Sequence, residues 1–205
     1  MDQYIESSGV RIYLSDNTYT PREDSFLMYD CILEYFTGTN QPIVEIGTGS
    51  GFTIIQVCSK WTNLTNIATD ISLDACLLTL KNAKTNRIDN LHIVRTDLCL
   101  PFRKGDHLST VIFNPPYLPA DPDTDGMMSE SELHQLVGGK KGYEIANRLV
   151  NIENLSGSQI LIIISSLSTN PVQFAKFHNT RNVQVIRTLH LGFETIWILL
   201  IKVMT

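Results

Sequence analysis

The stretch "PIVEIGTGSG", residues 42–51, decides the fold class of this 205-residue chain. Its apolar first part, residues 42–47, predicts a strand buried inside a sheet, and a helical stretch begins at about Phe52. The turn between them carries glycines at every second position: Gly47, Gly49 and Gly51. A buried strand that leads through a glycine-rich turn into a helix is typical of α/β proteins, where the turn lets backbone come close to a ligand.

Further apolar runs predict more strands, and helical stretches separate most of them. These strands are expected at 65–70, 91–97, 109–114 and 159–165. The chain closes with 183–203, two strands around a Leu-Gly-Phe connection, which are expected to pair antiparallel because no helix lies between them. The alternation of strands and helices predicts a mostly parallel sheet with helices on both faces.

Four further helical stretches are predicted besides the one that begins at about Phe52. One begins near Pro21, with Asp24 or Ser25 at its start, and another is capped by Ser72. Residues 143–155 and a short segment after Pro171 complete the set. The apolar face of the first helix is predicted to comprise Phe26, Leu27, Met28, Cys31, Ile32 and Leu33. That of the helix after Ser72 is predicted to comprise Leu73, Cys76, Leu77 and Leu80.

Composition restricts the class of protein. With 43% hydrophobic residues, the chain fits a single domain over 1–205 with a sizeable core. The net charge of −5 and the absence of a basic stripe argue against long-range capture of nucleic acid. The four cysteines are far apart and show no zinc-ligand spacing, so no metal site is expected and buried thiols are the favoured interpretation.

Neither a signal peptide nor a membrane span is expected from the sequence. The first ten residues lack a charged-then-apolar pattern, and no apolar run reaches about 18 residues. The chain is therefore expected to be cytoplasmic. Residues 119–139 form its one long acidic stretch, which is either a mobile functional loop or simply a solvated one.

Chemically distinctive residues follow the predicted strands at their carboxyl ends, where ligands bind in parallel sheets. Asp70 lies 23 residues after Gly47, where a carboxylate can accept both hydroxyls of a ribose. Asp97 ends the next strand and can accept from the amino group of an adenine; its alternative role is to cap a turn.

The glycine turn alone equally suits tight packing of helix on strand. A pyrophosphate is disfavoured because Glu45 precedes the glycines, whereas S-adenosylmethionine carries a sulfonium and an ammonium that suit a carboxylate.

The fourth distinctive strand end is the stretch "NPPY", residues 114–117. The prolines stop the strand because they cannot donate to the sheet. The side-chain oxygen of Asn114 and the carbonyl of Pro115 can accept the two N–H groups of a planar amide, and Tyr117 can stack on the amide plane near a cation. The stretch therefore predicts a rigid cradle for a flat NH₂ group, the alternative being a proline-rich turn with a capping asparagine.

Together, "EIGTGSG", Asp70, "TDL" (96–98) and "NPPY" resemble the class I methyltransferases. The chain is most similar to the HemK family, the release factor glutamine methyltransferases. "YTPREDSFL" (19–27) and "GGKKGYEIANRL" (138–149) are similar to motifs of its short archaeal and eukaryotic branch. The resemblance implies a Rossmann-like, mostly parallel sheet of seven strands with a C-terminal antiparallel strand. It also implies that the N-terminal helical segment, 1–38, covers the cofactor site and that 119–139 is a flexible substrate loop.

The resemblance further implies S-adenosylmethionine as cofactor, S-adenosylhomocysteine as product, and N5-methylation of the glutamine in the Gly-Gly-Gln loop of a class I release factor. The implied cofactor-binding residues are Ser25, Glu45, Gly47, Gly49, Asp70, Asp97, Leu98 and Asn114; the implied catalytic residues are Asn114, Pro115 and Tyr117. The family's threonine in the first helix is here Ser25, which keeps the hydroxyl. A small zinc-binding activator protein is the implied partner in a heterodimer, and the strand at 91–95 is the expected docking place.

Three alternatives to glutamine methylation remain open at this stage. The same cradle fits the exocyclic amine of adenine or guanine in DNA or RNA, with Tyr117 stacked on a flipped base. The acidic balance and the lack of a Lys/Arg run argue against that alternative and against direct sequence-specific binding of nucleic acid. A protein lysine is the second alternative, although its ammonium must first lose a proton and "NPPY" offers no base. A non-enzymatic module that kept the fold is the third alternative, and the intact Asn114 and Asp70 argue against it.

Overall fold

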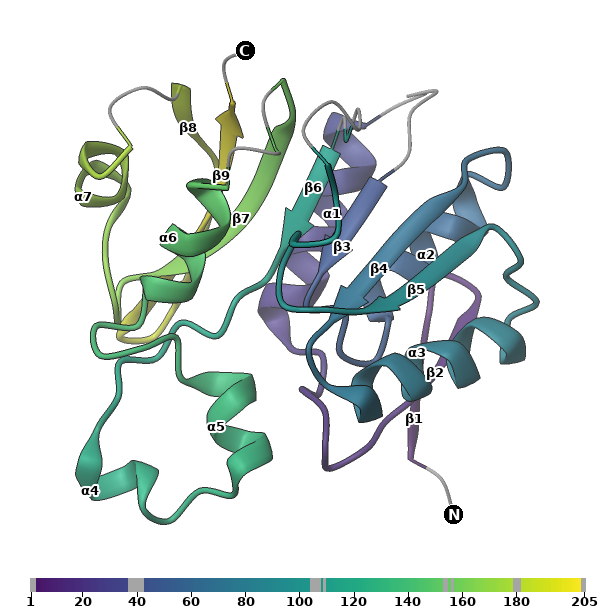
Figure 1. Cartoon of the computed structure of the whole chain (residues 1–205), viewed down its shortest axis with the longest axis horizontal. Coiled ribbons are helices and arrows are strands. Elements are labelled where there is room, and N and C mark those ends of the chain that lie inside the picture. The colour runs from purple at the N-terminus through teal and green to yellow at the C-terminus, as the bar shows by residue number, and fades with distance from the viewer. Residues whose placement is uncertain are drawn as a thin grey trace. The chain divides into compact units, whose positions relative to one another are not determined.

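The computed structural model describes residues 3–36, 43–103, 108, 110–152, 155, 157–178 and 182–203. The chain divides into two compact units, Met1–Pro101 and Phe102–Thr205 (Figure 1). Parts of the sequence-based predictions lie outside the described residues, namely 37–38, Pro42, Ser109 and 153–154. Within the described residues, no helix is long and apolar enough to cross a membrane.

The first unit holds three parallel strands of the sheet, in the order β5-β4-β3, with β5 at the edge. Its elements in chain order are β1 (Tyr4–Ser7), β2 (Val10–Tyr13), α1 (Glu23–Tyr35), β3 (Ile43–Ile46), α2 (Phe52–Lys60), β4 (Asn66–Asp70), α3 (Leu73–Thr85) and β5 (Leu91–Arg95). Asp70, the last residue of β4, is paired with Arg95, the last of β5, so the carboxyl ends of these two strands are level. The predicted strand–glycine turn–helix order is confirmed.

The second unit holds the other four strands of the mixed seven-stranded sheet, in the order β6-β7-β9-β8. Its elements are β6 (Thr110–Phe113), α4 (Pro122–Asp125), α5 (Glu130–Leu136), α6 (Glu144–Val150), β7 (Gln159–Ser165), α7 (Pro171–Lys176), β8 (Asn182–Leu191) and β9 (Glu194–Lys202). Strand β7 runs parallel to β6, whereas β9 runs antiparallel to β7 and β8. The predicted antiparallel C-terminal strand is therefore confirmed. Two short helices, α4 and α5, lie within the acidic stretch 119–139.

The predicted core face of α3 is wrong in part. Leu73, Leu77 and Leu80 are 48%, 54% and 40% exposed, although Cys76 is buried as expected. The helix instead buries polar residues, among them Thr79 and Asn82, because backbone groups satisfy their side chains and so remove the penalty of burial. Phe26 of α1, also expected in a core face, is exposed.

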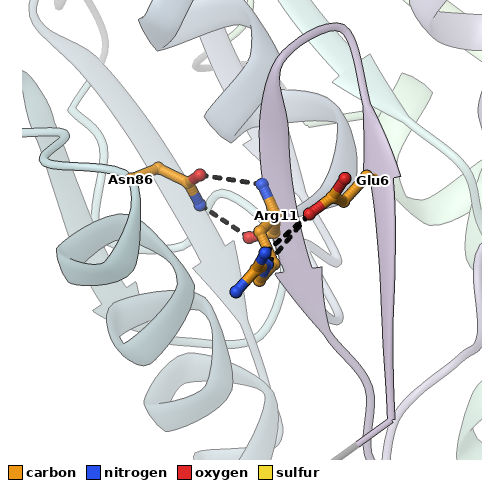
Figure 2. Close-up of polar contacts among 3 residues, drawn as sticks. All are labelled: Glu6, Arg11 and Asn86. Carbon is orange, nitrogen blue, oxygen red and sulfur yellow. Dashed lines mark hydrogen bonds and ion pairs between the residues drawn. The ribbon is translucent and has the colours of Figure 1, made fainter.

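The N-terminal segment, 1–38, predicted to be helical, is helical within its described residues only in α1, because two strands that the sequence did not suggest precede that helix. Strands β1 and β2 form an antiparallel hairpin, with Ser8 and Gly9 in its turn at φ of 49° and 80°. Figure 2 shows how the hairpin is tied to α3. The backbone N–H of Arg11 donates to Oδ1 of Asn86 at 2.8 Å, and Nδ2 of Asn86 donates to the carbonyl of Arg11 at 2.7 Å. The Arg11 guanidinium also pairs with Glu6 across the hairpin at 2.8 Å.

Candidate functional site

The glycine turn after β3 combines close packing with open space. Gly47, Gly49 and Gly51 all have positive φ, at 65°, 55° and 78°. A Cβ on Gly51 would lie 2.8 Å from Ile55 and 2.9 Å from Thr79, so this glycine lets the start of α2 pack closely. A Cβ on Gly49 would meet nothing within 4 Å. The turn therefore has a packed side at Gly51 and an open side at Gly49.

Asp70 is held against this turn at the carboxyl end of β4. Its Oδ2 accepts from the backbone N–H of Gly49 at 3.0 Å, and its Oδ1 accepts from the N–H of Ser72 at 2.9 Å. Burial raises the pKa of the Asp70 carboxyl, and these backbone hydrogen bonds oppose the rise. Each carboxylate oxygen can accept a further hydrogen bond, because each has a second lone pair.

Glu45, the third residue of β3, is a buried carboxyl at only 7% exposure. Burial raises its pKa from 4.5 to about 8, the hydroxyls of Thr48 and Thr53 lower it, and the charge of Asp70 raises it. The hydroxyl of Thr48 donates to Oε2 of Glu45 at 2.7 Å. In the chain without a ligand, the Glu45 carboxyl is therefore mostly protonated at neutral pH. A bound cation would favour its ionised form.

Two residues that sequence reasoning missed fix the turn from α3. The hydroxyl of Thr79 donates to the carbonyl of Gly49 at 3.1 Å. Nδ2 of Asn82 donates to the carbonyls of Ser50 and Tyr13 at 2.9 Å and 3.0 Å, and its Oδ1 accepts from the N–H of Tyr13 at 2.8 Å. Together with Asn86, these residues form a polar stripe at helical spacing. The spacing of this stripe could have predicted these contacts, because polar side chains on the buried face of a helix form hydrogen bonds, often to backbone groups.

The remaining predicted cofactor residues also lie in the first unit. Ser25 is buried in the first turn of α1, where its hydroxyl donates to Oδ1 of Asp24 at 3.2 Å. The next residue, Phe26, packs edge-to-face on Phe52 at the start of α2, with ring centroids 4.7 Å apart. Asp97 and Leu98 follow β5, and Leu98 is buried with φ at 50°. The first unit thus contains the predicted residues Ser25, Glu45, Gly47, Gly49, Asp70, Asp97 and Leu98.

The predicted amide cradle lies in the second unit, directly after β6. Phe113 ends the strand, Asn114 and Tyr117 are half-buried, and Pro115 is buried. The backbone of Leu118 continues the turn, donating to the carbonyl of Leu136 and accepting from the N–H of Gly138, both at 2.9 Å. The turn is therefore anchored to the end of α5 and to the segment that follows it, which restricts its movement.

Comparisons with known proteins match the chain to a methyltransferase family. Residues 26–134 match the family described as methyltransferase small domain. A protein of Methanocaldococcus jannaschii named as a protein N5-glutamine methyltransferase is 32% identical over 169 residues, which cover 80% of each chain. The release factor glutamine methyltransferase of Aliivibrio fischeri is 28% identical over 130 residues, 63% of this chain and 45% of that protein.

Solved structures share the fold at lower identity. A chain of the E. cuniculi Mtq2-Trm112 complex, described as responsible for methylation of the eRF1 termination factor, matches with a TM-score of 0.69 and 20% identity, over 91% of this chain and 99% of that one. M. jannaschii TYW2, solved in complex with AdoMet, matches with a TM-score of 0.59 and 12% identity, over 98% and 84% of the two chains. Both matches support the class I methyltransferase fold.

Proposed function

This chain belongs to the methyltransferase small domain family, and from that premise we propose that it methylates N5 of the glutamine in the Gly-Gly-Gln loop of a class I translation release factor. The observation that carries the proposal is the 32% identity to a protein named as an N5-glutamine methyltransferase, over 80% of both chains. The Asn-Pro-Pro-Tyr turn after β6 supports it, because Oδ1 of Asn114 and the carbonyl of Pro115 are acceptors that would suit the two N–H groups of an amide.

S-adenosylmethionine is the proposed cofactor, and when bound it supplies a methyl group activated by a sulfonium. Asp70 would accept hydrogen bonds from the ribose hydroxyls through the second lone pairs of its oxygens. Glu45, in its ionised form, would favour the cationic part of the cofactor. The open side of the glycine turn at Gly49 fits a ligand placed against backbone. Further proposed contacts are Ser25, Gly47, Asp97, Leu98 and Asn114.

The second unit supplies the proposed catalytic residues. An amide nitrogen is a poor nucleophile because its lone pair is delocalised into the carbonyl. Oδ1 of Asn114 and the carbonyl of Pro115 would accept the two N–H groups of the substrate glutamine, which orients the nitrogen and increases its electron density. Tyr117 would stack on the amide plane. As the nitrogen gains the methyl group it loses one of its protons, so the products are N5-methylglutamine, S-adenosylhomocysteine and a proton.

We further propose that a small zinc-binding activator forms a heterodimer with this chain by covering an apolar surface of the first unit. Leu73, Leu77 and Leu80 of α3 and Val94 of the edge strand β5 are all exposed. An edge strand also offers unpaired backbone groups to a partner. The E. cuniculi Mtq2-Trm112 complex supports this part of the proposal, because it is an assembly of two proteins with a chain of the same fold.

The test is methyl transfer from labelled S-adenosylmethionine, with and without a purified activator of this class. The substrates are the intact release factor, the same factor with the loop glutamine changed to asparagine, and an adenine-rich oligonucleotide. We expect label on the intact factor alone. Label on the oligonucleotide instead would refute the proposed substrate and favour methylation of a nucleobase amine, which the same turn could hold.

A further inference from the structure

The glycine run at 138–142, "GGKKG", touches the turn described above through the hydrogen bond from the N–H of Gly138 to the carbonyl of Leu118. It lies between α5 and α6 in the second unit and follows the excursion that starts after Leu118. Leu118 forms a parallel bridge with Val137, so the chain leaves the Asn-Pro-Pro-Tyr turn, passes through α4 and α5, and returns beside its own starting point. The two glycines at the ends of the run, Gly138 and Gly142, are both buried.

Both of these glycines lie against the backbone of the Asn-Pro-Pro-Tyr turn. A Cβ on Gly138 would overlap the carbonyl oxygens of Pro116 and Gly142. A Cβ on Gly142 would overlap the carbonyl oxygen of Tyr117 and lie 2.8 Å from the nitrogen of Pro119 and 2.7 Å from Cβ of Ser168. The colliding atoms belong mainly to backbone, which cannot rotate away as the end of a flexible side chain can. Any side chain here must therefore displace the turn, the glycine run, or both.

Three prolines in and beside the turn, Pro115, Pro116 and Pro119, have no N–H group and so cannot take part in backbone hydrogen bonds as donors. Leu118 supplies the links, donating to the carbonyl of Leu136 and accepting from Gly138, and the N–H of Ala120 donates to the carbonyl of Gly139. The carbonyl of Gly138 in turn accepts from Ile145 at 3.2 Å, which attaches the run to α6. Close packing of the glycines and these hydrogen bonds together support the turn.

We infer that Gly138 and Gly142 are positioning residues, which hold the carbonyl of Pro115 and the ring of Tyr117 where the substrate amide needs them. The inference rests on the proposed function and assigns the glycine run to the same site. Relief of the overlap with the carbonyl oxygen of Pro116 requires the turn and the glycine run to separate by about 1 Å, and misplacement of this size lowers rates by roughly 100-fold.

Gly138→Ala is the sharpest test, because the φ of Gly138 lies outside the left-handed region and the new Cβ introduces only the overlap. Gly192→Ala is the matched control. Gly192 has φ of 60°, and its Cβ would meet nothing within 4 Å, so that variant introduces backbone strain without a collision. Both variants are assayed on whichever substrate the wild-type enzyme methylates. Turnover is expressed per cofactor-binding site, with the number of sites taken from calorimetric titration.

We expect Gly138→Ala to lower kcat per site by about 100-fold while the Kd for the cofactor and the KM for the substrate stay within about threefold. Gly192→Ala should stay within about twofold of wild type. Equal turnover per site in Gly138→Ala and wild type would overturn the inference, as would a loss that disappears after correction for the number of sites. Transfer by the wild type to the oligonucleotide alone would refute the proposed substrate but leave this comparison intact.

Hydrogen exchange gives a readout that does not depend on activity. The N–H of Leu118 donates to the carbonyl of Leu136, so it should exchange slowly in the wild-type chain. In Gly138→Ala we expect exchange at least tenfold faster in a peptide that contains Leu118, with peptides from β7 unchanged. Gly192→Ala should leave the Leu118 peptide unchanged. Unchanged exchange in Gly138→Ala would mean that the turn keeps its place without the glycine, which contradicts the inference.

Discussion

The buried carboxyl of Glu45 predicts an unusual pH dependence of stability, which Glu45→Gln should remove. The carboxyl is 7% exposed, and its pKa is raised to about 8, chiefly by burial. Glutamine has nearly the same shape and lacks the charge, and its side-chain oxygen can still accept the hydrogen bond from Thr48. The substitution therefore tests the cost of ionising this group, with little change in packing.

Linkage between proton binding and folding sets the sign and the size of this pH effect on stability. A carboxyl whose pKa is higher in the folded state than in the unfolded state stabilises the fold fully only below the unfolded value. For Glu45 the stability present near pH 4.5 is lost as the pH rises to about 8. At about 1.4 kcal/mol per pKa unit, the full loss, reached above pH 8, is about 5 kcal/mol; about 3 kcal/mol is lost by pH 7, and about 3.5 kcal/mol is lost between pH 5 and pH 8. With urea m-values of roughly 2 kcal/mol/M, a loss of about 3.5 kcal/mol corresponds to a fall of about 2 M in the midpoint.

The assay is urea unfolding of the cofactor-free chain at pH 5 and pH 8, followed by tryptophan fluorescence. Trp61 lies in the first unit with Glu45, whereas Trp197 lies in the second. In a Trp197→Phe background, the fluorescence of Trp61 therefore reports on unfolding of the first unit. Glu132→Gln is the contrasting control, because hydrogen bonds from Ser129 lower the pKa of that exposed carboxyl.

We expect the midpoint of the parent to fall between pH 5 and pH 8 by about 2 M more than that of Glu45→Gln. The Glu132→Gln variant should keep the parent's fall. If the parent and Glu45→Gln lose the same stability over this interval, then Glu45 is not the buried carboxyl that the structure describes, and the electrostatic reasoning about its role fails.

Three further predictions concern the proposed roles. Asp70→Ala should weaken binding of S-adenosylmethionine by about 2–3 kcal/mol in calorimetric titration, because a charged acceptor of two hydroxyls is lost; an unchanged Kd would contradict the ribose assignment. Asn114→Ala should lower turnover per bound cofactor by roughly 100- to 1,000-fold, so a variant that stays active would refute the amide cradle. Leu77→Lys should make the isolated chain more soluble and weaken its binding to the activator in a pull-down titration, since the side chain is exposed and apolar; unchanged binding would exclude this face of α3.

The features that sequence predicted well depend on local rules. The strands at 43–46 and 159–165 are buried apolar runs, and such runs stay buried whatever surrounds them. Gly51 and Ser72 mark the starts of α2 and α3, because a glycine and a capping hydroxyl act on the adjoining turn. The antiparallel pairing of β8 and β9 follows from the short connection between them.

The features that sequence missed depend on partners far along the chain. Leu77 is exposed and Thr79 buried because α3 directs its hydrogen-bonding face toward the glycine turn and the N-terminal hairpin, and neither partner is visible in the helix's own pattern. The hairpin is held by Asn82 and Asn86, some 70 residues away. Likewise, the raised pKa of Glu45 results from burial, which residue type alone does not reveal.

The measurement that tests the central claim most directly is mass spectrometry of the release factor after incubation with S-adenosylmethionine, this chain and its activator. Fragmentation of the peptide that contains the Gly-Gly-Gln loop locates the added methyl group to a single side chain. The account predicts one methyl group on the side-chain nitrogen of that glutamine, and none when Asn114→Ala replaces the wild-type chain. A methyl group on a lysine of the factor, or an unmodified factor beside a methylated oligonucleotide, would contradict it.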